Sequence, residues 1–157
     1  MQTLENIPYD ELQLGQRVSV ERTVREEDIL LFAKLSGDVN PIHLDDAYAS
    51  TTQFGERIAH GMLTAAFISA AFAKHLPGPG SIYRNQSLRF RAPVKIGDTL
   101  TITIEVIDKR DRNHMVTMST IVTNQRGETI VTGEGSAIVP NEKIVIEAPD
   151  LPAIHIG

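Results

Sequence analysis

The sequence predicts an α+β fold in which an antiparallel sheet wraps around one long apolar helix. Residues 61–75 form the most apolar stretch of helical character, and four segments with the alternation of β-strands follow it. Turn signals separate these four segments, as expected for antiparallel hairpins. The order of one strand, helices and then four strands disfavours a doubly wound parallel sheet, in which strands and helices alternate.

The length of 157 residues fits one domain with one core. We assign residues 1–147 to this domain and residues 148–157, which contain Pro149 and Pro152, to an irregular C-terminal tail. Apolar residues make up 41% of the chain and charged residues 22%, which argues against a disordered or coiled-coil protein.

Charge and cysteine content exclude several function classes. The formal charge of -5 disfavours binding to nucleic acid or to an anionic membrane surface. The absence of cysteine excludes disulfides, thiolate catalysis and Cys-ligated zinc. The N-terminus lacks a basic, apolar leader, and the longest mainly apolar stretch, residues 62–73, is shorter than the ~20 residues of a membrane span. We therefore expect a cytoplasmic protein with no membrane partner.

Helix signals dominate the first part of the chain. Thr23 and Glu26 have the spacing of a capping box, which predicts a helix from there to Gly37. Pro41 lacks an amide hydrogen and disfavours helical backbone at Asn40, so we expect a loop that continues through His43. The further elements predicted here are a strand at 16–22 and a brief helix at 45–50.

The second part of the chain contains the central helix and the main sheet. Residues 61–75 have almost no polar face, which predicts a helix buried on most sides. In the clearest strand, apolar residues alternate with polar ones at Leu100, Ile102, Ile104 and Val106. The four predicted strands cover residues 81–91, 99–108, 115–124 and 129–139.

A carboxylate and an imidazole five residues apart are the first candidates for chemistry. Asp38 and His43 would point away from each other on a helix, but a loop lets both approach one point. Such a pair can hold a water molecule and move its protons. The alternative is that Asp38 only caps its own turn and His43 is an ordinary histidine.

The start of the central helix is the second candidate. His60 and Gly61 offer no side-chain oxygen to cap the helix, which leaves its first amides free. Gly61 also allows close approach, so a ligand carbonyl oxygen with partial negative charge could bind there as in an oxyanion hole. The alternative is a buried helix start satisfied by an upstream carbonyl or water. The His60 side chain could orient the loop, but we expect it to be structural.

These two motifs together resemble the MaoC-like, (R)-specific enoyl-CoA hydratase family. The resemblance is carried by two segments, SGDVNPIH at residues 36–43 and HGM at residues 60–62. It extends over roughly residues 10–140. The chain is also similar to the hydratase-like N-terminal part of fused phosphate acyltransferases. No such acyltransferase region is present in the sequence given.

The resemblance implies a hot-dog fold, a homodimer and an enoyl-CoA substrate. Asp38 and His43 would be the catalytic pair, the Gly61 amide would hold the thioester carbonyl, and Asn40 of the same motif would contact the substrate. The family requires no metal and no cofactor, since coenzyme A is part of the substrate.

Small residues on the central helix indicate room for an acyl chain. Gly61, Ala65, Ser69 and Phe72 share one stripe, and the Phe72 ring would close the space at its far end. The resemblance also implies that Ser69, Phe72 and Ala137 line the acyl pocket. This predicts a preference for short chains, around C4 to C6. The alternative is that Phe72 only packs in the core.

Basic residues near the first long strand are candidates for the phosphates of coenzyme A, because arginine forks match phosphate oxygens. The alternative is a solvated sheet face. The residues are Arg84, Arg89, Arg91 and Lys95.

A metal site is disfavoured, because the nearest ligand types follow no established spacing. Those residues are Asp38, His43, Asp45 and Asp46. The remaining histidines, His75, His114 and His155, are expected to be exposed.

Two other functions stay open at the level of sequence. A hot-dog thioesterase would use the same carbonyl holder but deliver water to the thioester carbon. A non-catalytic acyl-CoA-binding module would hold the substrate unreacted. The Asp38 and His43 pair favours the hydratase.

Overall fold

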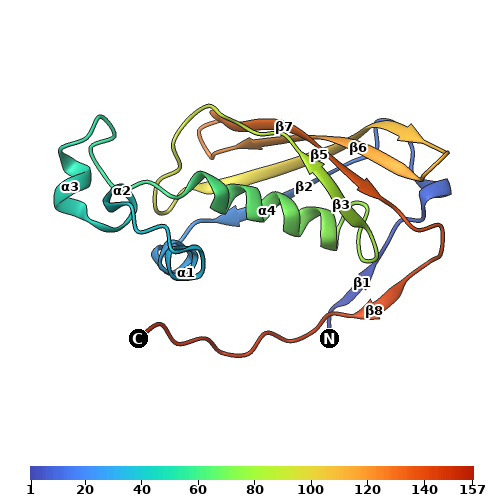
Figure 1. Ribbon diagram of the computed structural model, residues 1–157, viewed down its shortest axis with the longest axis horizontal. Coiled ribbons are helices and arrows are strands. Elements are labelled where there is room, and N and C mark those ends of the chain that lie inside the picture. Colours follow the sequence, from blue (N-terminus) through green and yellow to red (C-terminus); the bar gives the residue numbers. More distant parts are fainter.

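The computed structural model describes residues 1–157 and contains one main antiparallel sheet packed on one long helix (Figure 1). The helix α4 (Gly61–Lys74) lies along one face of this sheet. The strand order is β2-β5-β6-β7-β3, and β4 also pairs with β7. The strands are β2 (Arg17–Thr23), β3 (Ile82–Gln86), β4 (Arg89–Phe90), β5 (Thr99–Arg110), β6 (Met115–Thr123) and β7 (Thr129–Ile138).

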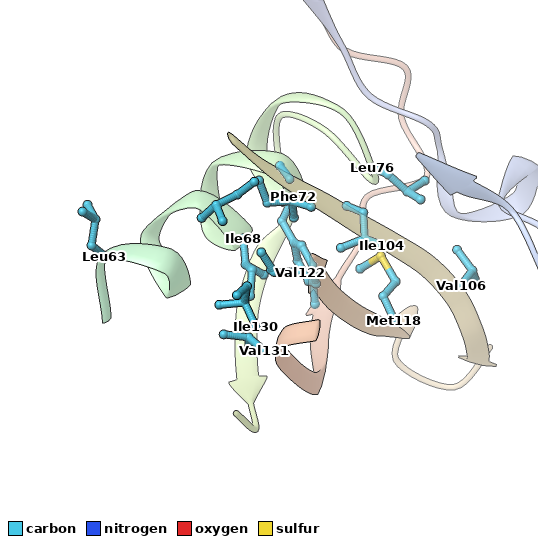
Figure 2. Close-up of a cluster of buried hydrophobic side chains, with 14 of the residues drawn as sticks. Leu63, Ile68, Phe72, Leu76, Ile104, Val106, Met118, Val122, Ile130 and Val131 are labelled. Atoms are coloured by element: carbon cyan, nitrogen blue, oxygen red, sulfur yellow. The ribbon is translucent and has the colours of Figure 1, made fainter. Parts of the chain in front are cut away.

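The core lies between the sheet and α4. The predicted alternation on β5 is confirmed, since its four apolar residues at positions 100 to 106 are at most 1% exposed. Ile68 and Phe72 of α4 pack in the same cluster as Met118 and Val122 of β6 (Figure 2).

The central helix is buried on one side only, which corrects the expectation of burial on most sides. Met62 is 56% exposed, and Ala66, Ser69 and Ala70 are exposed too. The reason is geometric, because a single sheet can cover only one face of a helix.

Three helices gather at one end of the sheet (Figure 1). They are α1 (Glu26–Ser36), α2 (Pro41–Leu44) and α3 (Asp46–Ser50). The predicted end of α1 is confirmed, since Gly37 adopts φ +79° and its N–H bonds to the Ala33 carbonyl. The brief helix expected at 45–50 is α3, capped by the Asp45 side chain.

The predicted cap of α1 is wrong. Thr23 ends strand β2, where its hydroxyl hydrogen-bonds to Thr99 across the ladder. The residue before the helix is Arg25, and its N–H donates to the Asp28 carboxylate at 2.9 Å. The strand ladder therefore continues through the position where the sequence places a cap.

The loop expected through His43 is shorter than predicted. Residues 37–40 are irregular, but α2 begins at Pro41 and contains His43. Proline fits the first position of a helix because its missing N–H would have no partner there. The Asn40 side chain caps this helix by accepting the Ile42 N–H.

The strand expected at 81–91 is split into β3 and β4, which both pair with β7. The Ser87 N–H donates to the Glu134 carbonyl, and the Ser87 carbonyl packs against Gly133, where a side chain would not fit. The register with β7 shifts between Tyr83 and Asn85. The chain thus bends around β7 instead of continuing straight.

A second, two-stranded sheet joins the N-terminal segment to a strand that follows the main sheet in sequence. It pairs β1 (Thr3–Glu5) with β8 (Val145–Glu147), and the short helix η1 (Tyr9–Glu11) follows β1. No helix or strand follows Glu147, while the domain boundary drawn there stays a prediction. None of the helices has the length and apolar character needed to cross a membrane.

Candidate active site

A cavity of about 530 Å³ opens at the N-terminal end of α4 and brings the main candidates together. Asp38, His43 and Gly61 all line it. They come from the loop after α1, from α2 and from the start of α4. The rest of the wall is mainly apolar, with Phe54, Met62, Phe90, Val94 and Ile130.

Local contacts hold the Asp38 loop in shape. Gly37 releases the chain from α1, and the Ser36 hydroxyl accepts the Asp38 N–H. One Asp38 carboxylate oxygen accepts the Asn40 N–H at 3.1 Å. Asp38 therefore does cap its turn, as the simpler interpretation expects, but it also lines the cavity. A carboxylate has enough acceptor sites for both roles.

His43 is held in one tautomer by the backbone. The side chain is 8% exposed, and Nδ1 lies 2.7 Å from the Ile58 carbonyl oxygen. Since a carbonyl only accepts, Nδ1 carries the hydrogen, and Nε2 of the neutral ring is left as an acceptor. His43 is thus prepared to accept a proton.

Asp38 and His43 bring polar side-chain atoms close together at the cavity. Asp38, His43 and His60 each place a polar side-chain atom within 4.8 Å of the others. A water that donates two hydrogen bonds of about 2.8 Å spans roughly this separation.

Asp38, His43 and His60 form the cluster of ligand-type residues that could hold a metal ion. The Asp45 carboxylate instead caps α3, and Asp46 pairs with Arg57 at 2.8 Å. The expectation that the protein needs no metal stays a prediction.

Gly61 lines the cavity, and its amide has no hydrogen-bond acceptor in the chain. The residue before α4, His60, makes no side-chain cap, and the Gly61 N–H donates to no backbone oxygen. A side chain at Gly61 would lie 2.8 Å from the Phe90 ring, so only glycine fits beside it without a shift. The helix start is therefore open to a ligand oxygen.

Arg57 ties the helical end together just before α4. Its guanidinium bonds to Glu26 of α1 at 2.7 Å and to Asp46 of α3 at 2.8 Å. The hydrogen bond with Glu26, helped by Asp46, raises the pKa of Arg57 above its usual value despite partial burial. These bonds fix the frame that carries Asp38 and His43.

The expected acyl-pocket residues do not line this cavity. Phe72 is 1% exposed and stacks on Tyr83 at 4.6 Å, and Ala137 is equally buried in the core. After Gly61 and Met62, the next residue of α4 that lines the cavity is Thr64. Ala65 and Ser69 do not line it.

Of the four basic candidates, only Arg91 lines the cavity. Arg84 lies beside Arg110 and Glu134 in a separate polar cavity on the sheet, and Arg89 is exposed on β4. Lys95 pairs with Glu56 at 2.8 Å. Asn40 is exposed and caps α2 with its side chain.

The other histidines differ in their exposure to solvent. His75 and His155 are exposed as expected. His114 is half-buried instead, because its ring stacks on Tyr9 at 4.4 Å. His60 is buried and makes the structural contacts expected of it, including a hydrogen bond to the Asp38 loop.

Comparison with known proteins places this chain in a family. A family model described as a MaoC like domain matches residues 11–126. The chain belongs to the MaoC-like domain family. Within it, an "(R)-specific enoyl-CoA hydratase" of Rhodospirillum rubrum is 48% identical over 84% of this chain and 91% of its own. Another of that name from Aeromonas caviae is 41% identical over 82% of this chain and 96% of its own.

Solved structures show the same MaoC-like architecture, known as the hot-dog fold. The R-hydratase PhaJ1 from Pseudomonas aeruginosa, in its unliganded form, has a TM-score of 0.95 and 52% identity, with 99% of this chain and 100% of that chain covered. The (R)-hydratase from A. caviae involved in PHA biosynthesis has a TM-score of 0.80 and covers 82% of this chain and 98% of that chain. The predicted α+β hot-dog fold is confirmed.

Proposed function

We propose that this protein is an (R)-specific enoyl-CoA hydratase. It adds water reversibly to a trans-2-enoyl-CoA and forms an (R)-3-hydroxyacyl-CoA. The observation that carries the proposal is the single cavity in which Asp38, His43 and the free Gly61 amide meet.

The three groups supply the parts of the reaction in turn. Asp38 and His43 Nε2 hold the water, and the pair takes one of its protons while the water oxygen bonds to the β-carbon. The electrons of the double bond move toward the thioester oxygen, where the Gly61 N–H stabilises the negative charge. The pair then returns a proton to the α-carbon. Water's oxygen and both hydrogens thus enter the product.

The apolar wall supports this chemistry by limiting water near the acyl chain. Phe90 and Ile130 face the same cavity as the catalytic pair. A low-dielectric wall strengthens the interaction between an enolate oxygen and an amide dipole.

Coenzyme A and a second subunit complete the proposal. Arg91 is the basic residue of the cavity wall and is our first candidate for a phosphate contact, ahead of Arg84 and Arg89. We also propose a cytoplasmic homodimer. The acyl-pocket residues that we propose are Ser69, Phe72 and Ala137, as the resemblance implies, and Ala65 of the small-residue stripe on α4. A single chain does not bring these residues to the cavity wall.

The test is an assay with crotonyl-CoA as substrate. Hydration removes the absorbance of the conjugated enoyl thioester and leaves the thioester bond intact. We expect this absorbance to fall without release of free thiol, and the product to have the (R) configuration. Release of thiol would indicate a thioesterase, and binding without turnover would indicate a non-catalytic module.

A further inference from the structure

His60 lies against both proposed catalytic residues, although the mechanism above gives it no role. His60 is the residue directly before α4, and it is 2% exposed. Its ring packs on the His43 ring with 3.9 Å between centroids, and on Phe32 of α1 with 4.9 Å.

A polar contact connects His60 to Asp38. His60 Nε2 lies 3.0 Å from the backbone carbonyl oxygen of Asp38. Because that oxygen only accepts, Nε2 carries the hydrogen. Nδ1 of the neutral ring then has a lone pair, and this atom is buried without any hydrogen-bond partner in the chain.

The lone Nδ1 indicates that histidine is not at this position for stability alone. A buried polar atom without a partner destabilises the folded state. Phenylalanine would fill similar space between Phe32 and His43 without this cost. Compared with phenylalanine, histidine adds the N–H that donates to the Asp38 backbone carbonyl.

This contact links parts of the site that are distant in sequence. The other hydrogen bonds of Asp38 are local, to Ser36 and Asn40. His60 is 22 residues away and is the neighbour of Gly61. It therefore joins the loop of the catalytic pair to the helix start that would hold the carbonyl.

We propose that His60 is a positioning residue. As the neutral Nε2–H tautomer it fixes the Asp38 backbone with its N–H and the plane of His43 with its ring, so that both side chains reach the same water. The proposal rests on the hydratase function above. It extends the site to a residue that contacts no reacting atom.

Three substitutions separate positioning from a merely structural role. His60→Phe keeps a buried ring but removes the N–H, and we expect kcat for crotonyl-CoA to fall by about 10- to 100-fold, since a misplacement of about 1 Å can cost about 10²-fold. KM should change little, and the melting temperature should stay equal or rise. His60→Gln places an amide nitrogen near the position of Nε2 and should recover much of kcat. His60→Asn, with the same amide on a shorter side chain, should not.

The outcomes decide the proposal in either direction. A His60→Phe variant with wild-type kcat, or equal losses in the Gln and Asn variants that follow a loss of melting temperature, would overturn it. If His60→Phe does not fold, the Gln and Asn pair decides.

Nitrogen NMR of the imidazole rings tests the contact without any activity. We expect the Nε2–H tautomer at His60, and an Nδ1–H tautomer would contradict the proposal. A wild-type protein that does not hydrate crotonyl-CoA would instead reject the proposed function, while the NMR result would still report on His60.

Discussion

At the residue scale, Asp38 and His43 depend on each other for their proposed chemistry. Asp38→Asn keeps an oxygen to accept the Asn40 N–H but removes the negative charge. His43→Gln removes the Nε2 acceptor that the Ile58 contact leaves free. We expect each variant to lose about 10²–10⁴-fold in kcat while it stays folded, the usual contribution of general acid–base catalysis. Steady-state hydration of crotonyl-CoA measures this.

The matched control for these variants is Glu27→Gln. Glu27 is an exposed acid of α1 outside the cavity, and its substitution makes the same change in charge as Asp38→Asn. It should leave kcat unchanged. Near-full turnover in either Asp38→Asn or His43→Gln would remove that residue from the mechanism.

The sequence identifies some site residues and misses others for a physical reason. Asp38, His43 and Gly61 carry side-chain or backbone properties that stand out in a short motif. The Ile58 carbonyl that sets the His43 tautomer, and the Phe90 ring beside Gly61, leave no such sign. A backbone carbonyl is the same in every residue, and Phe90 reaches Gly61 only after β4 pairs with β7.

At the element scale, the sequence predicts the periodic elements and some of their ends, such as the end of α1 at Gly37, but not others. The alternation on β5 and the apolar run of α4 match the structure because each depends on nearby residues. The start of α2 at Pro41 is local, but proline is read as a helix breaker and also fits the first position of a helix. The break between β3 and β4 depends on hydrogen bonds between distant parts of the chain, such as Ser87 to Glu134. Strands β1 and β8 also pair distant segments and were not predicted for the same reason.

The packing of α4 on the sheet gives a prediction for Phe72. Its ring is buried and stacks on Tyr83, whose pKa burial raises to about 12. Phe72→Ala should reduce the free energy of unfolding by about 3–5 kcal/mol, as measured by chemical denaturation. Phe72 does not line the cavity of a single chain, but we propose above that it belongs to the acyl pocket of the dimer. Phe72→Ala should therefore raise kcat/KM for octenoyl-CoA relative to crotonyl-CoA, while an unchanged order for crotonyl-, hexenoyl- and octenoyl-CoA would show that Phe72 only packs in the core.

Asp98 links the turn before β5 to the turn between β6 and β7, and it predicts a dependence of stability on pH. The residue is 4% exposed. Burial raises its pKa, but hydrogen bonds from the Gln125 amide, the Lys95 N–H and the Arg126 guanidinium outweigh burial and hold the pKa below its usual value.

A carboxylate with a lowered pKa in the folded state stabilises the fold above its unfolded pKa of about 3.9. This contribution disappears as the pH falls through the lower folded value. We therefore expect the free energy of unfolding to decrease below about pH 4, and Asp98→Asn to decrease less over the same range. Urea denaturation between pH 3 and 6 checks this. Parallel pH curves for the two proteins would contradict it.

At the scale of the whole molecule, the two edges of the main sheet differ in character. Strand β2 presents charged residues, including Arg17 and Glu21, which discourage edge-to-edge pairing. Near the opposite edge Ile82 of β3 is 59% exposed and Phe90 of β4 is 53% exposed. The face of α4 turned away from the sheet is exposed too, with Met62 at 56%. Exposed apolar surface of this kind marks association sites.

The proposed dimer should therefore form through the β3 edge, which would extend the sheet into the second subunit. We expect a mass of about 35 kDa by sedimentation at micromolar concentration, twice the chain mass of 17.3 kDa. Ile82→Lys would place an unpaired charge in that interface and should shift the protein toward the monomer. Glu21→Lys, a lysine on the β2 edge, should leave the dimer intact. A monomeric wild type would reject the dimer, whereas a dimer that tolerates Ile82→Lys but not Glu21→Lys would move the interface to β2.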